Sequence, residues 1–249
     1  MTKTTTLAKP EPEKALATVP AYLQGQGQKG LEQADQGDVT LPRLAIAQSG
    51  TPQCKKSSPK HIDGLEEGDL FNTLTGKVYG RKVKAIPVLF FKSAIKFKPK
   101  DDKGAPAGID GMRPRVTDST LADYLFGEDG AKPEWTLFRN FVCWLPEHKE
   151  MVVASMKSTS TKVAKQWIAF MRQANVPAYG KVYTITTIPE HRDQYDYFNF
   201  EIPFSQEFTP EQLFREADSL YNGMVGKDLK IDVEDLAAEE NMDAEPAAF

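Results

Sequence analysis

Apolar residues alternate with polar ones, or run in β-branched and aromatic stretches, over most of the middle of the chain. Short stretches of this kind, separated by Gly, Pro, Asn and Asp, are typical of β-strands joined by turns. The pattern predicts strands at residues 39–46, 68–71, 77–98, 135–145, 151–156, 181–188 and 196–204. We therefore expect a chain that is mainly β.

Two segments, residues 162–173 and 210–222, place apolar residues three and four positions apart, which predicts amphipathic helices. A run of Ser and Thr at 158–161 offers N-cap side chains for the first of them. A third, short helix is expected at 119–126. The helices are too few to change the fold class.

Several short strands with one or two packed helices fit an α+β chain built on a partly open β-barrel of the oligonucleotide-binding type. A β-sandwich fits the same pattern. Residues 100–117 are rich in Asp, Gly and Pro and are expected to form an exposed loop. We expect a disordered N-terminal arm at 1–38, which is too polar to bury a core, a folded core at 39–226 and a C-terminal tail at 227–249.

Charge is distributed unevenly along the chain. The formal net charge is −4, but residues 228–249 hold eight acidic residues and one lysine, so the rest of the chain has a net charge of +3. A mildly basic body with an acidic tail indicates a polyanionic ligand for the body and a separate role for the tail.

Residues 77–100, the basic segment, contain eight Lys or Arg residues and no Asp or Glu. Aromatic residues are interleaved with them, and proteins that bind single strands combine cations for the phosphates with flat rings for the unpaired bases. From residue 92 onward, period-two geometry places the lysines on one face of a strand and Ile95 and Phe97 on the other. Lysines on the solvent side of a sheet, with core phenylalanines behind them, would give the same pattern.

A second basic group flanks the Ser/Thr run and the helix after it, where hydroxyls and a helix N-terminus could meet phosphate oxygens. The two groups and their neighbours give the residues expected to contact DNA: Lys77, Tyr79, Arg81, Lys82, Lys84, Phe91, Lys92, Lys96, Lys98, Lys100, Arg139, Trp144, Lys157, Lys162 and Lys165.

The C-terminal segment is acidic and ends in an aromatic residue. Residues 234–249 contain six acids and no base, and the chain ends in Phe249. Here the sequence resembles single-stranded-DNA-binding proteins of bacteria and their phages, and its single large body resembles the phage members more than the bacterial tetrameric type. The resemblance implies a tail that docks replication, recombination or repair proteins and competes with DNA for the basic groove. The docking residues that it implies are Glu239, Glu240, Asp243, Glu245, Pro246 and Phe249.

We therefore expect a protein that binds single-stranded DNA without sequence preference, recruits replication or recombination proteins through its tail, and requires no cofactor. A homodimer is one arrangement open to it.

Two other classes of function also fit the sequence. One is a metal-dependent nuclease centred on Glu147 and Lys149, with Asp118 or Asp129 as a further ligand. The other is a phage accessory protein that binds a host enzyme and no DNA.

Motifs of other chemistries are missing from the sequence. The three histidines are isolated, and neither a nucleophile elbow nor a phosphate-binding loop occurs, so no catalytic residue is expected. Cys54 and Cys143 lack the spacing of a zinc site or a disulfide framework. Neither a signal peptide nor an apolar run of roughly 18 residues occurs, so we expect a cytoplasmic protein without a membrane span, in the host cytoplasm if it is encoded by a phage.

Overall fold

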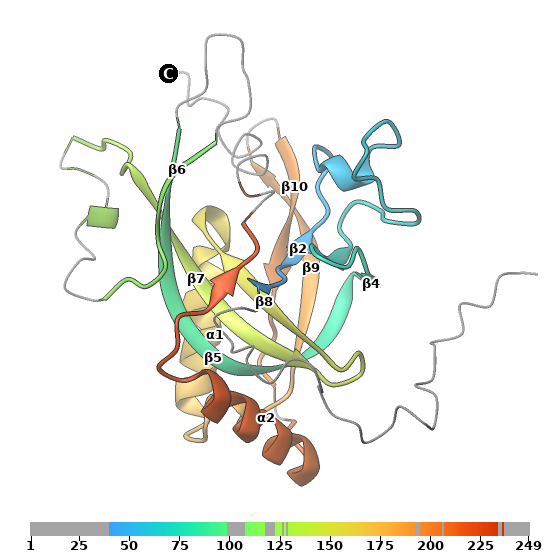
Figure 1. Cartoon of the computed structure of the whole chain (residues 1–249), viewed down its shortest axis with the longest axis vertical. Helices are drawn as coiled ribbons and strands as arrows, with labels where there is room; N and C mark the ends of the chain where they lie inside the picture. The colour runs from blue at the N-terminus through green and yellow to red at the C-terminus, as the bar shows by residue number, and fades with distance from the viewer. Residues whose placement is uncertain are drawn as a thin grey trace, which may run out of the picture. The chain divides into compact units, whose positions relative to one another are not determined.

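The computed structural model describes residues 40–98, 108–117, 123–125, 127, 129–192, 195–205, 207–233 and 236. All of these residues belong to one compact unit, Asp35–Phe249. Within them the chain forms eleven β-strands and two α-helices (Figure 1). The prediction of a mainly β, α+β chain with one or two packed helices is confirmed.

The main sheet has six strands, and all of its pairings are antiparallel. Its path runs through β10 (Tyr195–Glu201), β9 (Tyr183–Arg192), β5 (Lys82–Phe97), β7 (Trp135–Leu145) and β8 (Glu150–Met156), and β6 (Ile109–Arg113) pairs with the far end of β5. The long strand β5 curves through the unit and joins β9 to β7 (Figure 1). The sheets formed by the described strands are open. The oligonucleotide-binding topology itself stays a prediction.

Two smaller sheets accompany the main one. The strands β2 (Leu44–Ile46), β3 (Leu70–Asn72) and β4 (Val78–Gly80) form an antiparallel sheet, and β1 (Thr40–Leu41) pairs in parallel with β11 (Lys230–Ile231).

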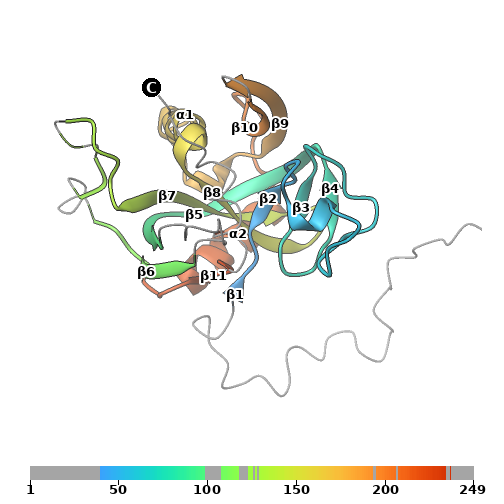
Figure 2. The same ribbon diagram turned by 90° about the horizontal axis from the view of Figure 1, so that it is seen from above.

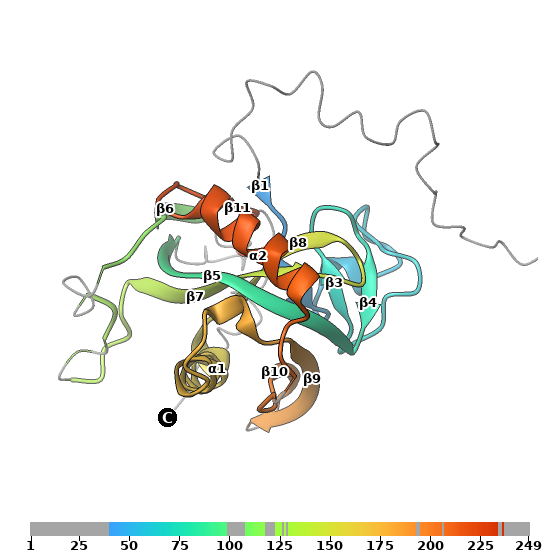
Figure 3. The same cartoon turned by 90° about the horizontal axis from the view of Figure 1, so that it is seen from below.

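The two helices cover opposite faces of the main sheet. Helix α1 (Thr161–Gln173) and helix α2 (Glu211–Met224) lie on either side of β5 and β7, seen both from above and from below (Figures 2 and 3). Trp167 of α1 is fully buried in one core with Phe141 of β7, whereas Met224 of α2 is buried in a second core with Val142, the next residue of β7. A strand whose two faces are both covered by helices needs apolar residues at consecutive positions, which explains the unbroken apolar run in β7.

A bulge in β5 exchanges the two faces of the strand. The register with β7 shifts between Pro87 and Leu89. Proline has no backbone N–H to donate to a ladder, so a bulge is a favourable place for it. Before the bulge, odd-numbered residues such as Val83 belong to the core of α1; after it, even-numbered Phe90 packs there. The position of the bulge therefore determines on which face of the main sheet each cation of β5 lies.

Two elements differ from the predictions. Strand β6 lies within residues 100–117, which were expected to form a loop. Gly111, one of the glycines of this segment, makes room for the Trp135 ring, because a Cβ atom at this position would lie only 3.0 Å from it. Strand β11 lies within the predicted tail, and Leu229, Ile231 and Leu236 are buried. As far as the structure describes it, the first part of the tail is packed on the core.

The expected arm at 1–38 and most of the short helix at 119–126 lie outside the described residues. Within the described part of the chain, no helix is both long enough and apolar enough to cross a membrane.

Candidate nucleic-acid interface

The cations of the basic segment are divided between the two faces of the main sheet. Lys82 and Lys84 precede the bulge and share a face with Ile86, which packs in the core of α2. Lys92 follows the bulge and shares a face with Phe90, which packs against the core of α1. The basic segment therefore does not form one continuous surface.

Lys77, just before strand β4, and Tyr79, on β4, both bond to another side chain of the protein. The Lys77 Nζ donates to Glu150 Oε1 at 2.8 Å, and the Tyr79 hydroxyl donates to Glu150 Oε2 at 2.5 Å. Burial and the hydrogen bond to Glu150 raise the pKa of Tyr79. Burial would raise the pKa of Glu150, but the hydrogen bonds from Lys77 and Tyr79 outweigh it and hold that pKa below its ordinary value. The group ties the small sheet to the β7–β8 hairpin.

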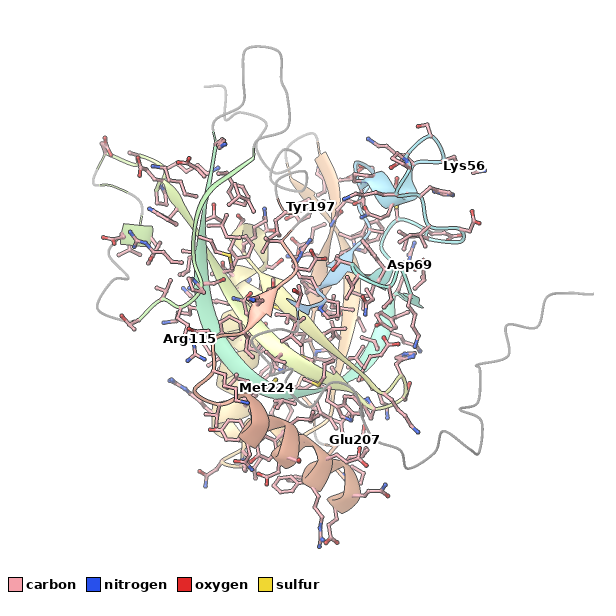
Figure 4. All side chains as sticks on the ribbon, in the orientation of Figure 1. Lys56, Asp69, Arg115, Tyr197, Glu207 and Met224 are labelled. Carbon is pink, nitrogen blue, oxygen red and sulfur yellow. The ribbon has the colours of Figure 1, made fainter. Side chains whose placement is uncertain are left out.

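The next cations of the segment also contact the protein itself. The Arg81 guanidinium lies 5.2 Å from the centroid of the Phe198 ring and donates to a backbone carbonyl. Lys84 forms an ion pair of 3.2 Å with Glu207, which lies beside the start of α2 (Figure 4). Lys82 is exposed. Most cations at this end of the basic segment therefore already have partners within the protein.

The rings proposed as base-stacking residues in this region face the core of α2. Phe91 and Trp144 both pack against that core, and the Trp144 Nε1 is buried without a partner among the described residues. Because packing against the core covers ring surface on which a base would stack, we exclude Phe91 and Trp144 from the candidate interface.

Lys92 and Arg139 lie side by side on β5 and β7, on the face that α1 covers. The half-buried Arg139 guanidinium donates to Thr161 Oγ1, at the start of α1, over 3.3 Å. Burial lowers the pKa of Arg139, and among the described residues no carboxylate pairs with it. A cation withdrawn from water without an anion is unfavourable, and a phosphate oxygen would compensate it.

The N-terminus of α1 lies beside Arg139 and has no side-chain cap. Its N-cap residue, Ser160, makes no side-chain capping bond and its first turn holds no acidic residue. The Ser160 hydroxyl instead donates to Asn199 Oδ1 at 2.6 Å. A 3-10 turn, Ser158–Ser160, leads into the helix, and the Thr161 N–H donates to the Ser158 carbonyl. The helix dipole still gives this end a partial positive charge that adds to that of Arg139.

The solvent-facing side of α1 is basic along its whole length. Its exposed charged residues are Lys162, Lys165 and Arg172, and residues 161–173 contain no Asp or Glu. Thirteen residues of helix span about 20 Å. We call the following set the α1 surface: Lys92, Arg139, Lys162, Lys165 and Arg172. It unites parts of both predicted basic groups.

Strand β6 brings to this region a cation that was not predicted from the sequence, Arg113, which is already paired with Asp123 at 3.1 Å. The Arg113 guanidinium lies 4.4 Å from the centroid of the Trp135 ring and 5.7 Å from that of Tyr124. Lys96, the partner of Trp135 on β5, pairs with Glu134 at 3.0 Å. Arg113 could have been found only by recognising residues 109–113 as a strand.

The remaining predicted contacts are dispersed. The Lys157 Nζ lies 5.8 Å and 5.9 Å from the ring centroids of Phe97 and Phe138, on the opposite face from Arg139. Lys98 is exposed. Several predicted residues lie outside the described part of the chain, and these are Lys100, Glu239, Glu240, Asp243, Glu245, Pro246 and Phe249.

The residues of the nuclease alternative do not come together. Glu147 and Lys149 are exposed in the turn between β7 and β8. Asp129 accepts a hydrogen bond from the backbone of Ala131, two residues away, and Asp118 lies outside the described residues. Within the described ranges, no group of three or more His, Cys, Asp or Glu residues could hold a metal ion.

A cavity of about 320 Å³ lies between the β9–β10 hairpin and the loop after β2. Its lining includes the carboxylates of Glu67, Glu190 and Asp196, and Asp196 accepts from His191 over 2.8 Å. Three carboxylates would repel phosphate, so this cavity does not extend the α1 surface.

A family model described as Pam3 phage gp34-like protein matches residues 11–230. No match was found among the curated proteins or among the solved structures. Because the family match spans most of the chain and all of its main sheet, the chain belongs to the Pam3 phage gp34-like protein family and is a bacteriophage protein.

Proposed function

We propose that this phage protein binds single-stranded DNA without sequence preference, and that the strand lies along the α1 surface. The observation that carries the proposal is the pairing of Arg139, a half-buried guanidinium without a carboxylate partner among the described residues, with an uncapped helix N-terminus. Both features favour a bound anion, and the cations along α1 continue the positive charge away from that point.

A phosphodiester chain fits this arrangement better than an isolated anion does. The α1 surface extends over about 20 Å, which exceeds the size of one phosphate group and suits several consecutive ones. The contacts offered are charges and a helix end, which recognise the backbone and leave the base sequence unread. Binding should therefore be strong at low salt and indifferent to sequence.

A salt-titrated anisotropy measurement tests the proposal. Labelled oligo-dT, a mixed-sequence single strand and a duplex of equal length are each titrated with the full-length protein. We expect tight, sequence-independent binding of both single strands, weaker binding of the duplex and a steep loss of affinity with salt. Absence of single-strand binding at low salt would refute the proposal.

The acidic C-terminal segment is proposed to recruit replication or recombination proteins of the same phage system, as the resemblance noted above implies. Because Leu236 is buried beside Ile95 and Phe138, the truncation that tests this should remove residues 237–249 only. Affinity for DNA should stay equal or rise, since a competing polyanion is lost, while binding of a phage replication protein should disappear. Weaker DNA binding by this truncation would contradict the proposed competition.

A further inference from the structure

The cavity between the β9–β10 hairpin and the loop after β2 has the form of a ligand pocket. Its lining combines Pro189, Tyr197 and Phe198 with a few charged side chains. Concave sites of about 300 Å³ or more, with apolar walls and a small number of polar groups, are typical of ligand binding. At the rim, the side chains of His191 and Asp196 are 67% and 90% exposed, so a ligand can enter from solvent.

The carboxylate of Glu190 is fixed in this cavity by neutral donors. Its Oε2 accepts from the Tyr197 hydroxyl at 2.6 Å, and its Oε1 accepts from Asn199 Nδ2 at 3.1 Å. Asn199 is only 3% exposed and accepts in turn from Ser160. The carboxylate is therefore held in place before a ligand arrives, which lowers the entropy cost of binding. Each of its oxygens still has a lone pair for one further donor.

The negative charge of the cavity is not balanced by a lysine or an arginine. Of the described residues, His191 pairs with Asp196 at 2.8 Å, and neither Lys nor Arg pairs with Asp196 or Glu190. Arg81 contacts the Phe198 ring, but it donates to the backbone carbonyl of Glu67 and not to a carboxylate. The cavity thus favours a cationic ligand and disfavours a nucleic acid.

A guanidinium group suits this lining better than other cations do. Among the described residues, no group of three or more His, Cys, Asp or Glu could hold a metal ion. A guanidinium is planar, packs against flat apolar walls and donates several hydrogen bonds in a fixed geometry to carboxylates. Pro189 and Tyr197 supply the walls, and Glu190 supplies acceptors.

The position of the cavity favours a guanidinium that belongs to another protein. Strand β10 lies at the end of the path of the main sheet, so a segment of a partner chain can reach the cavity from the side of this strand. We propose that the cavity binds the side chain of an arginine presented by a partner protein. This site lies apart from the α1 surface, and the proposal does not depend on the binding of DNA.

Backbone-amide NMR of the full-length protein tests the proposal with three capped peptides. They are acetyl-Gly-Arg-Gly-amide, the same peptide with citrulline, which is a neutral isostere of arginine, and the same peptide with lysine. The arginine peptide should give saturable shifts at residues 190–191 and 196–198, and the citrulline peptide should give none. The lysine peptide should bind several-fold more weakly, because an ammonium makes no planar, two-pronged contact. Absence of saturable shifts there, or equal shifts with citrulline, would overturn the proposal.

Two variants separate the cavity from the other acidic groups of the chain. Glu190→Gln/Asp196→Asn removes two charges and keeps the side-chain sizes, and it should weaken binding of the arginine peptide roughly tenfold. The matched control, Glu147→Gln/Asp129→Asn, removes the same charge from exposed positions outside the cavity and should change affinity less than about twofold. Equal losses in both variants would show general attraction of a cationic peptide and would refute the site.

A third variant guards against a folding defect, since Glu190 also bonds Tyr197 and Asn199. Asp196→Asn alone changes a side chain that is 90% exposed, and it should weaken the arginine peptide about threefold while the remaining amide spectrum stays unchanged. Unchanged affinity in this variant and in the double variant would contradict the proposal. Tighter binding of free spermidine than of the arginine peptide would assign the cavity to a free polyamine and would also contradict it.

Discussion

Two regions of this protein, residues 77–84 and 161–173, are both basic and free of acidic residues in sequence, but they differ in the structure. At one end of the basic segment, Lys77 and Lys84 pair with carboxylates of the same molecule, and Arg81 lies over an aromatic ring. On the α1 surface, Arg139 contacts a hydroxyl, and all the charged residues on the exposed side of α1 are cations.

The partners of a cation therefore matter more for binding than the number of cations does. A lysine paired with a neighbouring carboxylate already has its counter-charge, and a phosphate would have to displace it. The free energy of a half-buried guanidinium without a counter-charge is lowered when an anion binds to it. We therefore expect substitutions on the α1 surface to change binding, and substitutions among the paired groups of the other region to change binding little.

The largest effect should come from removing the charges of α1. A Lys162→Gln/Lys165→Gln/Arg172→Gln variant should lose roughly 100-fold in affinity for oligo-dT at low salt, because three phosphate contacts disappear. The matched variant Arg81→Gln/Lys82→Gln/Lys84→Gln removes the same charge from the other region and should lose less than about threefold. Anisotropy titration measures both. Equal losses would show that only net charge matters.

Replacing Arg139 should reduce binding without reducing stability. Arg139→Gln is expected to weaken oligo-dT binding roughly tenfold, since one half-buried charge-assisted contact is lost, and Arg139→Lys should recover part of it. The free energy of unfolding, measured in urea, should stay equal or increase, because an uncompensated charge is removed from a half-buried site. A clear loss of stability with unchanged binding would assign Arg139 to the fold.

The salt dependence of binding sharpens the comparison further. Each neutralised phosphate contributes about 0.7 to the slope of log K against log salt for single strands, so the α1 triple variant should show a slope smaller by about 2. The triple variant at Arg81, Lys82 and Lys84 should keep the wild-type slope. Titrations at several salt concentrations give both values, and a reduced slope in the second variant would place phosphate contacts there.

The smallest effect concerns Glu150, where stability should change and binding should not. Glu150→Gln should lower the free energy of unfolding by about 1 kcal/mol near neutral pH, because the bonds from Lys77 and Tyr79 weaken. The folded state lowers the pKa of Glu150, so its stabilisation is present above the ordinary pKa and is lost as the pH falls through the folded value. Urea unfolding at about pH 7 and about pH 3 should therefore show a difference between variant and wild type that shrinks in acid. Unchanged oligo-dT affinity is the second half of this prediction.

Local patterns predicted the strands and helices well. Strand β7 occupies residues 135–145 as expected, and both long helices appear within two residues of their predicted ends. These segments are long, periodic and rich in residues that suit one conformation, so tertiary contacts did not need to override them.

Features that depend on distant contacts could not be predicted. The bulge beside Pro87 reverses the faces of β5, and no local rule fixes which residue it falls on. Strand β6 needs β5 as a partner, and β11 needs β1, from the other end of the chain. Likewise, Ser160 was a reasonable N-cap candidate, but its hydroxyl donates to Asn199 of β10 and leaves the helix without a side-chain cap.

Photo-cross-linking of a halogenated single strand to the full-length protein, followed by identification of the cross-linked peptides, tests the central claim most directly. We predict that cross-links concentrate in and around residues 161–173, with few at 77–84. Cross-links concentrated at 77–84, with α1 unmodified, would contradict the account.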